Sequence, residues 1–222
     1  LLGGGTLLVG TSSGEIAGWF PVALEGAAAT ASESRDGFEF VRAKALAEAN
    51  KGRGAVRDFA ASTRSRMAIA GFDHGTIAVY HATSEKEVLA EQTETGAAGA
   101  VAMSPKEDGL LAMTGERVYY WGFDPGHPEA TARTLFAPVR YEGYAEPKFM
   151  WQSSAATDEF EPKLSLIPLV FGTIKATFYS MLFGGPLALL AALYTSEFLH
   201  ARAKSVVKPT IELMASLPSV VL

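Results

Sequence analysis

The longest apolar stretch of the chain, LIPLVFGTIKATFYSMLFGGPLALLAALYTSEFL at residues 166–199, constrains its fold more than any other feature. Between Pro168 and Leu193 the only charged residue is Lys175. A helix rises about 1.5 Å per residue, so about 20 apolar residues cross the hydrocarbon core of a bilayer. The alternative is a buried helix of a large soluble protein, but such helices seldom run so long without a polar face. The sequence therefore predicts a membrane-embedded chain.

Charge is distributed unevenly along the chain. Residues 1–160 carry 21 acidic and 14 basic residues, whereas residues 161–222 carry 3 acidic and 5 basic ones. Nucleic-acid-binding surfaces are basic, so the acidic first part gives no support for that class of function. The absence of cysteine excludes disulfides, cysteine metal sites and a thiol nucleophile. The chain begins at a leucine and ends within a second apolar run, and we expect it to be an internal fragment of a longer polypeptide.

Three segments before the apolar stretch share one pattern, an apolar strand, a tight turn and a second strand that ends in an aromatic residue. They are residues 7–20, 67–80 and 110–121. The equivalent turn glycines are Gly14, Gly75 and Gly115, and the equivalent aromatic residues are Trp19, Tyr80 and Trp121. Two-residue hairpin turns need positive φ, which glycine adopts without strain. The pattern predicts three β-hairpins.

The spacing of the hairpins indicates a repeat. The last two lie about 40 residues apart, which is typical of the four-stranded blade of a β-propeller. Residues 55–62 and 99–104 are candidate first strands of blades, and residues 23–54 are expected to form a loop or short helix. The segment is loosely similar to WD-repeat propellers, although the Trp-Asp and Gly-His pairs are missing; an unrelated meander or sandwich is the alternative. We predict a mainly β, incomplete propeller-like domain at residues 1–124, because two or three blades cannot close a ring.

The polar residues of this first part do not form a catalytic or metal-binding pattern. His74 with Asp73, and His127 with Asp124, lie in predicted turns or loops and lack partners at ligand spacing. The Walker-type phosphate loop is also missing. We therefore predict no catalytic residue, no cofactor-binding residue and no metal site, and we do not expect an enzyme.

Residues 125–165 are rich in proline and aromatic residues, which is typical of a connector at the bilayer interface. A transmembrane helix is predicted at residues 166–199, followed by a basic loop at 200–209 and the start of a further transmembrane helix at 210–222, in which Pro209 begins the helix. Short basic loops mark the cytoplasmic side of a membrane, so residues 1–165 are expected to be extracytoplasmic.

The span contains residues that predict helix packing or a kink. Gly184 and Gly185 allow a second helix to approach closely, and Pro186 removes one backbone hydrogen bond. Lys175 lies near the end that adjoins the extracytoplasmic part, where a lysine can extend to the headgroups; a role in an ion pathway is the alternative. Glu212 is interpreted either as part of a pathway or cytoplasmic interface, or as exposed near the headgroups.

The last 60 residues resemble the permease subunits of bacterial phosphate importers, which belong to the binding-protein-dependent ABC transporters. The resemblance is carried by Gly172-Thr173, Pro186-Leu187-Ala188, Tyr194-Thr195-Ser196-Glu197, Lys208-Pro209, Glu212-Leu213 and Pro218-Ser219-Val220-Val221. From these motifs and the residues of the span, we predict packing or kink positions at Gly172, Thr173, Gly184, Gly185, Pro186, Pro218 and Ser219, and candidate interface or pathway positions at Lys175 and Glu212. Residues 127–166 also look like an enlarged variant of these permeases that carries an extracytoplasmic insert.

The resemblance implies a multi-pass protein of the bacterial inner membrane that imports inorganic phosphate. Its expected partners are a second permease subunit, a cytoplasmic ATPase that supplies ATP hydrolysis, an extracytoplasmic phosphate-binding protein and membrane lipid. Relatives that carry other oxyanions share this architecture. The main alternative is a membrane-anchored propeller that binds a protein partner outside the cytoplasm, as a sensor or scaffold; an exported propeller hydrolase lacks a nucleophile and base.

Overall fold

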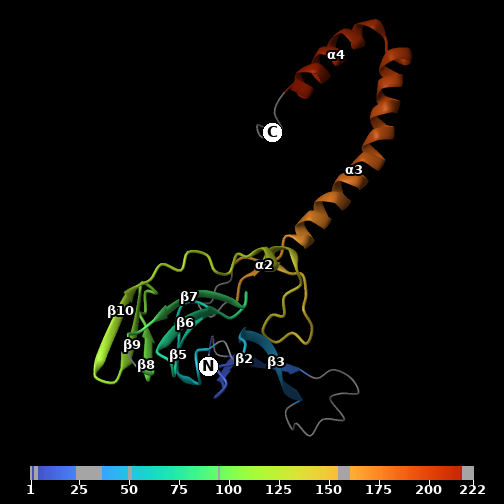
Figure 1. Ribbon diagram of the computed structural model, residues 1–222. Helices are drawn as coiled ribbons and strands as arrows, with labels where there is room; N and C mark the ends of the chain where they lie inside the picture. Colours follow the sequence, from blue (N-terminus) through green and yellow to red (C-terminus); the bar gives the residue numbers. More distant parts are fainter. Residues whose placement is uncertain are drawn as a thin grey trace. The chain divides into compact units, whose positions relative to one another are not determined.

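The computed structural model describes residues 2, 5–23, 37–49, 52–94, 96–154 and 161–216. The chain divides into two compact units, Leu1–Leu169 and Val170–Leu222. The first unit is mainly β and the second is helical (Figure 1). The predicted order of a β part followed by an apolar helix is therefore confirmed.

Three antiparallel sheets form most of the first unit (Figure 1). The first sheet contains β1 (Leu7–Gly10), β2 (Ile16–Ala23) and β3 (Phe38–Ala47). The second contains β4 (Val56–Ala61), β5 (Met67–Phe72), β6 (Thr76–His81) and β7 (Lys86–Gln92). The third contains β8 (Ala100–Met103), β9 (Gly109–Thr114) and β10 (Arg117–Gly122). Each sheet follows the chain order from one edge to the other, so each is a simple meander.

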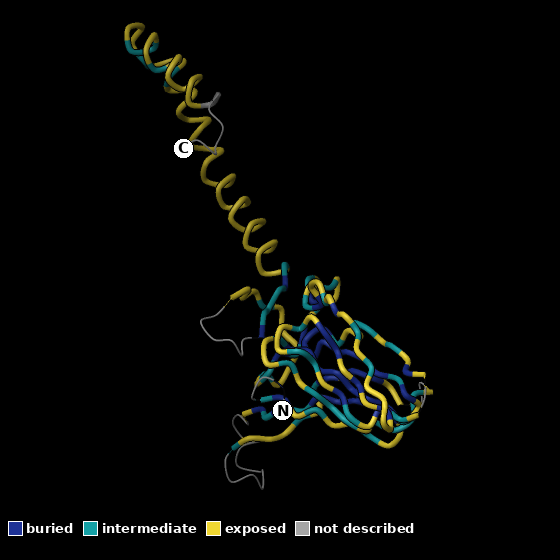
Figure 2. The backbone as a smooth tube through the Cα atoms, turned by 90° about the vertical axis from the view of Figure 1, so that its left-hand side faces the viewer, coloured by how far each residue is buried: buried dark blue, intermediate teal, exposed yellow. Residues whose placement is uncertain are grey.

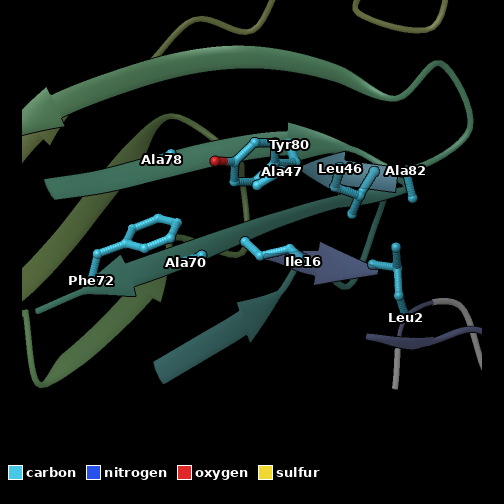
Figure 3. Close-up of a cluster of buried hydrophobic side chains, with 9 residues drawn as sticks. All are labelled: Leu2, Ile16, Leu46, Ala47, Ala70, Phe72, Ala78, Tyr80 and Ala82. Atoms are coloured by element: carbon cyan, nitrogen blue, oxygen red, sulfur yellow. The ribbon is translucent and has the colours of Figure 1, made fainter. Parts of the chain in front are cut away.

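The second sheet is packed on both of its faces. One hydrophobic cluster lies between it and the first sheet; its members are Leu2, Ile16, Leu46, Ala47, Ala70, Phe72, Ala78, Tyr80 and Ala82 (Figure 3). A second cluster lies between it and the third sheet, and contains Met67, Ile69, Ile77, Val79, Ala98, Val101, Leu110, Ala112 and Phe123. All six residues of β5 are buried for this reason. Figure 2 shows the burial concentrated in this unit.

All three predicted hairpins are confirmed, as β1–β2, β5–β6 and β9–β10. Their turn glycines have positive φ, at 81° for Gly14, 78° for Gly75 and 57° for Gly115. The two candidate first strands are also confirmed as β4 and β8.

Two details of the β prediction differ from the structure. Residues 38–47, expected as part of a loop or short helix, form the ten-residue strand β3. Pairing along the whole of β2 decides this, because sheet contacts outweigh the helix propensity of alanine, glutamate and lysine. A propeller is also not shown: among the described residues the sheets are open, and only the second sheet has four strands.

The connector is folded against the β unit. It contains α2 (Ala132–Phe136) and a two-stranded sheet of β11 (Trp151–Gln152) and β12 (Lys163–Leu164). Immediately before the long helix, the amide of Ser165 donates to the carbonyl of Met150 (2.9 Å), and the amide of Leu166 donates to the carbonyl of Leu135 (2.9 Å). The polypeptide therefore enters the helix from a hydrogen-bonded position.

The helical part contains α3 (Ile167–Leu193), a π-helical turn (Tyr194–Phe198) and α4 (Ala201–Ser216). In the residues that the structure describes, one helix, Ile167–Phe198, is long and apolar enough to cross a membrane. The predicted basic loop at residues 200–209 is helical in the structure. Helix α4 begins at Ala201, and Pro209 lies inside this helix instead of starting it. Pro218 and Ser219 lie outside the described residues.

Candidate functional site

One face of α3 is built from small and hydroxyl-bearing residues. Together with Met181 they line a shallow groove: Thr173, Ala176, Thr177, Ser180, Gly184, Gly185 and Ala188. Thr173, Thr177, Ser180, Gly184 and Ala188 follow one another by three or four residues, which places them on the same side of a helix. A Cβ atom added at Gly184 or Gly185 would meet no atom within 4 Å, apart from the backbone of the helix itself. The groove is thus open to a second helix, because small residues allow two backbones to approach closely.

The structure places only some of the predicted packing or kink residues of α3 in the groove. Thr173, Gly184 and Gly185 line the groove, whereas Gly172 and Pro186 do not. Pro186 follows Gly184 by two residues, about 200° around the helix, so it lies on the other side. The sequence reasoning missed Ala176, Thr177, Ser180 and Ala188, although their spacing from Gly184 was a readable signal.

The remainder of α3 is apolar, and no described residue packs over it closely enough to bury it. None of its residues in Ile167–Leu193 is buried, and the exposed side chains include Phe171, Phe178, Phe183 and Leu187. Figure 2 shows this helix as exposed along its length. Because exposed apolar surface on this scale is unfavourable in water, the helix requires lipid or other helices around it.

A second groove lies between the end of α3 and α4. Its lining residues are Ala188, Ala191, Ala192, Thr195, Ser196, Lys204, Lys208, Ile211 and Glu212. The Nζ of Lys204 donates to the carbonyl oxygen of Ser196 (2.7 Å). This bond satisfies a carbonyl near the end of the preceding helix, where the helix dipole also favours a cation. Glu212, predicted as an interface or pathway residue, lies in this groove, but Lys175 lies in neither groove and its Nζ is 5.9 Å from the ring centroid of Tyr179.

In the β unit, a polar cluster attaches the connector to the sheets. Arg66 forms an ion pair with Glu142 (2.7 Å), which also accepts a hydrogen bond from the hydroxyl of Thr6 (2.8 Å). Glu161 accepts bonds from the hydroxyl of Thr83 (2.6 Å) and from the amide of Glu142 (2.8 Å). These bonds join residues up to 136 positions apart. They hold the segment that precedes α3 against the first two sheets.

Burial lowers the pKa of two side chains near this cluster, Lys44 and His81. Desolvation lowers the pKa of Lys44, against the opposing effect of the charges on Glu161 and Glu85. Desolvation also lowers the pKa of His81 to about 4. The Nδ1 of His81 accepts from the amide of Ser84 (3.2 Å), which is the arrangement of a neutral ring.

The other histidines do not form a site. His74 hydrogen-bonds through Nδ1 to the carbonyl of Gly52 (2.7 Å), and His127 contacts Glu129 (3.0 Å). Asp73 pairs with Arg57, a contact that lowers its pKa. Among the described residues, no group of three or more histidine, aspartate or glutamate side chains is arranged to hold a metal ion.

The described geometry is that of an apolar helix long enough to cross a membrane, with a groove of small residues along it, preceded by a β unit. No protein-family model matches the chain. The chain is 30% identical over 98 residues to the probable ABC transporter permease protein YqgH of Bacillus subtilis (strain 168). The similarity covers 41% of this chain and 32% of YqgH, so it spans about a third of that relative's length.

Proposed function

We propose that this chain is part of a permease subunit of an ABC importer of inorganic phosphate in a bacterial inner membrane. The observation that carries the proposal is the groove on α3. An apolar helix without cover, with a continuous face of small residues, is suited to pack against other membrane helices, and the distant similarity is to a permease. The choice of phosphate rests on the resemblance of residues 166–222 to phosphate permeases.

The remaining parts of the importer follow from this proposal. A second permease subunit supplies helices that complete the pore, a cytoplasmic ATPase supplies the energy, and an extracytoplasmic binding protein delivers phosphate. The span beginning near Ile167 leads to a basic segment that contains Arg202, Lys204 and Lys208, which favours the cytoplasm at that end. The β unit then lies outside, in a multi-pass protein. Cleavage of the β unit by protease added to spheroplasts tests this sidedness, and full protection beside a digested extracytoplasmic control contradicts it.

Radiolabelled phosphate uptake in a permease-deficient strain tests the function, with the full protein, its ATPase and its binding protein expressed together. Gly184→Leu fills the groove and is expected to reduce uptake at least tenfold, because the partner helix is displaced. Gly172→Leu is the matched control, since Gly172 lies outside the groove lining and the same bulk is added. Equal loss in both variants contradicts the packing face, and failure of the full protein to restore uptake contradicts phosphate import.

The β unit is expected to have a regulatory or docking role and not to form the pore. Deletion of residues 1–150 should leave uptake in place with altered affinity. Complete loss of uptake by a deletion variant that still inserts in the membrane would assign the β unit an essential role.

A further inference from the structure

Two lysines converge on one tyrosine ring in the connector, shortly before α3. The Nζ atom of Lys148 lies 5.3 Å from the centroid of the Tyr144 ring, and the Nζ atom of Lys163 lies 5.7 Å from it. Lys163 also lies 5.8 Å from the centroid of the Tyr141 ring. The face of an aromatic ring attracts a cation at such distances, so Tyr144 holds two ammonium groups in one place.

Hydrogen-bonded backbone positions these side chains. Val139 and Lys148 form an antiparallel bridge, in which each amide donates to the carbonyl of the other residue (3.2 and 2.9 Å). Between them the amide of Tyr144 donates to the carbonyl of Tyr141 (3.1 Å), which closes a turn. Lys163 belongs to β12 and is held by the pairing of that strand with β11. Both lysines therefore extend from fixed backbone and not from a loose loop.

The lysines lie close to the point where the chain enters the apolar helix. Lys163 precedes Ile167, the first residue of α3, by four residues, which span at most about 13 Å at about 3.3 Å per residue. The amide of Ser165 donates to the carbonyl of Met150. Because these two segments run antiparallel, the residues before Met150, including Lys148, lie toward α3. Long lysine side chains can carry their charge to lipid headgroups over such distances.

Exposed aromatic side chains accompany the lysines. Phe136 is 57% exposed, Phe149 44% and Trp151 43%. Each of them is paired with residues 164–166, or is next in sequence to a residue that is hydrogen-bonded to that segment. Aromatic rings are enriched where a membrane meets water, because that region accommodates an apolar ring beside polar groups. Cations and exposed aromatic rings thus occur together at the beginning of the span.

The charge of this cluster differs from that of the chain around it. Residues 1–160 carry 21 acidic and 14 basic residues. Among the residues that the structure describes, no carboxylate forms an ion pair with Lys148. The cluster therefore suits an anion. A soluble anion has no need of apolar neighbours, whereas a phospholipid joins an anionic headgroup to apolar chains, as the exposed aromatic rings and the nearby span require.

We propose that Lys148, Lys163 and Tyr144 form a binding site for the headgroup of an anionic phospholipid, with Phe149 and Trp151 in contact with the same lipid. The two ammonium groups donate hydrogen bonds to the phosphate oxygens, and the Tyr144 ring keeps them together before the lipid binds. The site holds the connector at the membrane surface. The inference rests on α3 crossing a membrane, as in the proposed function, and is independent of the transported substrate.

Contact between Trp151 and lipid tests the site. The full-length polypeptide, with Trp151 as its only tryptophan, is reconstituted in vesicles of equal parts phosphatidylglycerol and phosphatidylcholine. One of the two lipids carries brominated acyl chains, which quench tryptophan fluorescence on contact. We expect quenching by brominated phosphatidylglycerol to exceed quenching by brominated phosphatidylcholine by about threefold, because each lysine near a membrane surface attracts anionic lipid. Equal quenching by the two lipids contradicts the site.

Charge variants separate a defined site from general attraction. Lys148→Gln combined with Lys163→Gln should remove the preference for phosphatidylglycerol. Lys86→Gln combined with Lys106→Gln is the matched control, since both lysines are exposed, belong to the same unit and give the same change in net charge. A preference that survives in the first variant, or is lost equally in the second, overturns the assignment. Circular dichroism of each variant verifies that it remains folded.

Two further measurements distinguish the sources of the anion and the level of a failure. If inorganic phosphate removes the preference and sodium chloride of equal ionic strength does not, the lysines bind soluble phosphate and the lipid assignment is wrong. Resistance to extraction by alkaline carbonate shows whether the span inserts. An extracted protein contradicts the span and with it the proposed function, whereas a resistant protein without lipid preference contradicts the headgroup site alone.

Discussion

Arg66 provides the sharpest test of how the connector is held against the β unit. Its side chain is 7% exposed and it lies 2.7 Å from a carboxylate oxygen of Glu142, and its Nη1 also donates to the carbonyl of Leu2 (3.4 Å). Arg66→Met preserves most of the aliphatic length and removes the charge. The substitution leaves Glu142 with the hydroxyl of Thr6 and without its ion-pair partner.

The expected loss follows from the burial of the two partners. Removing one member of a buried ion pair costs about 3–5 kcal/mol, because the remaining charge is left in a poorly solvated place. The side chain of Glu142 is 21% exposed, so water partly compensates it and the loss should fall near the lower end, about 3 kcal/mol. With an m-value of about 2 kcal/mol per molar urea, the unfolding midpoint should fall by about 1.5 M.

Tryptophan fluorescence during urea unfolding of the chain in detergent measures this change. All three tryptophans, Trp19, Trp121 and Trp151, belong to the first unit, so the signal reports the β unit alone. Arg57→Met is the control, since Arg57 and Asp73 form an exposed pair with side-chain exposures of 56% and 27%, and such pairs contribute less than about 1 kcal/mol. The double variant Arg66→Met, Glu142→Leu should lose less than Arg66→Met alone. A midpoint for Arg66→Met no lower than that of Arg57→Met refutes the reasoning.

Two further predictions concern a buried histidine and the proline of the span. Because the folded pKa of His81 is about 4, against 6.5 for an ordinary histidine, the unfolded chain binds more protons between these values, and the free energy of unfolding should fall by about 3 kcal/mol as the pH drops from 6.5 towards 4. His81→Gln should remove this part of the pH dependence, and parallel stability–pH curves for both proteins contradict it. Pro186→Ala should change phosphate uptake far more than membrane insertion, since an apolar helix without proline still inserts; uptake at the wild-type rate rules out a hinge or packing role for Pro186.

Much of the local structure could be predicted from the order of residues alone. The hairpins depend on glycine in the turns, where positive φ excludes most other residues. The span could be predicted because an apolar run of this length is typical of a helix that crosses a membrane. The groove on α3 was equally accessible, because the spacing of Thr177, Ser180 and Gly184 places them on one side of a helix before any contact is considered.

Other features depend on contacts between distant residues. Residues 38–47 have the composition of a helix and become β3 because β2 offers a full row of hydrogen-bonding partners. The bond from Thr6 to Glu142 joins residues 136 positions apart, and no local pattern marks either one as a partner. Strand β5 shows the same limit: its residues are apolar or small throughout, and only the packing of the first and third sheets against the second decides that both faces of β5 are buried. Local propensity thus determined most elements of this protein, whereas contacts between distant residues determined strand β3 and the partners of the elements.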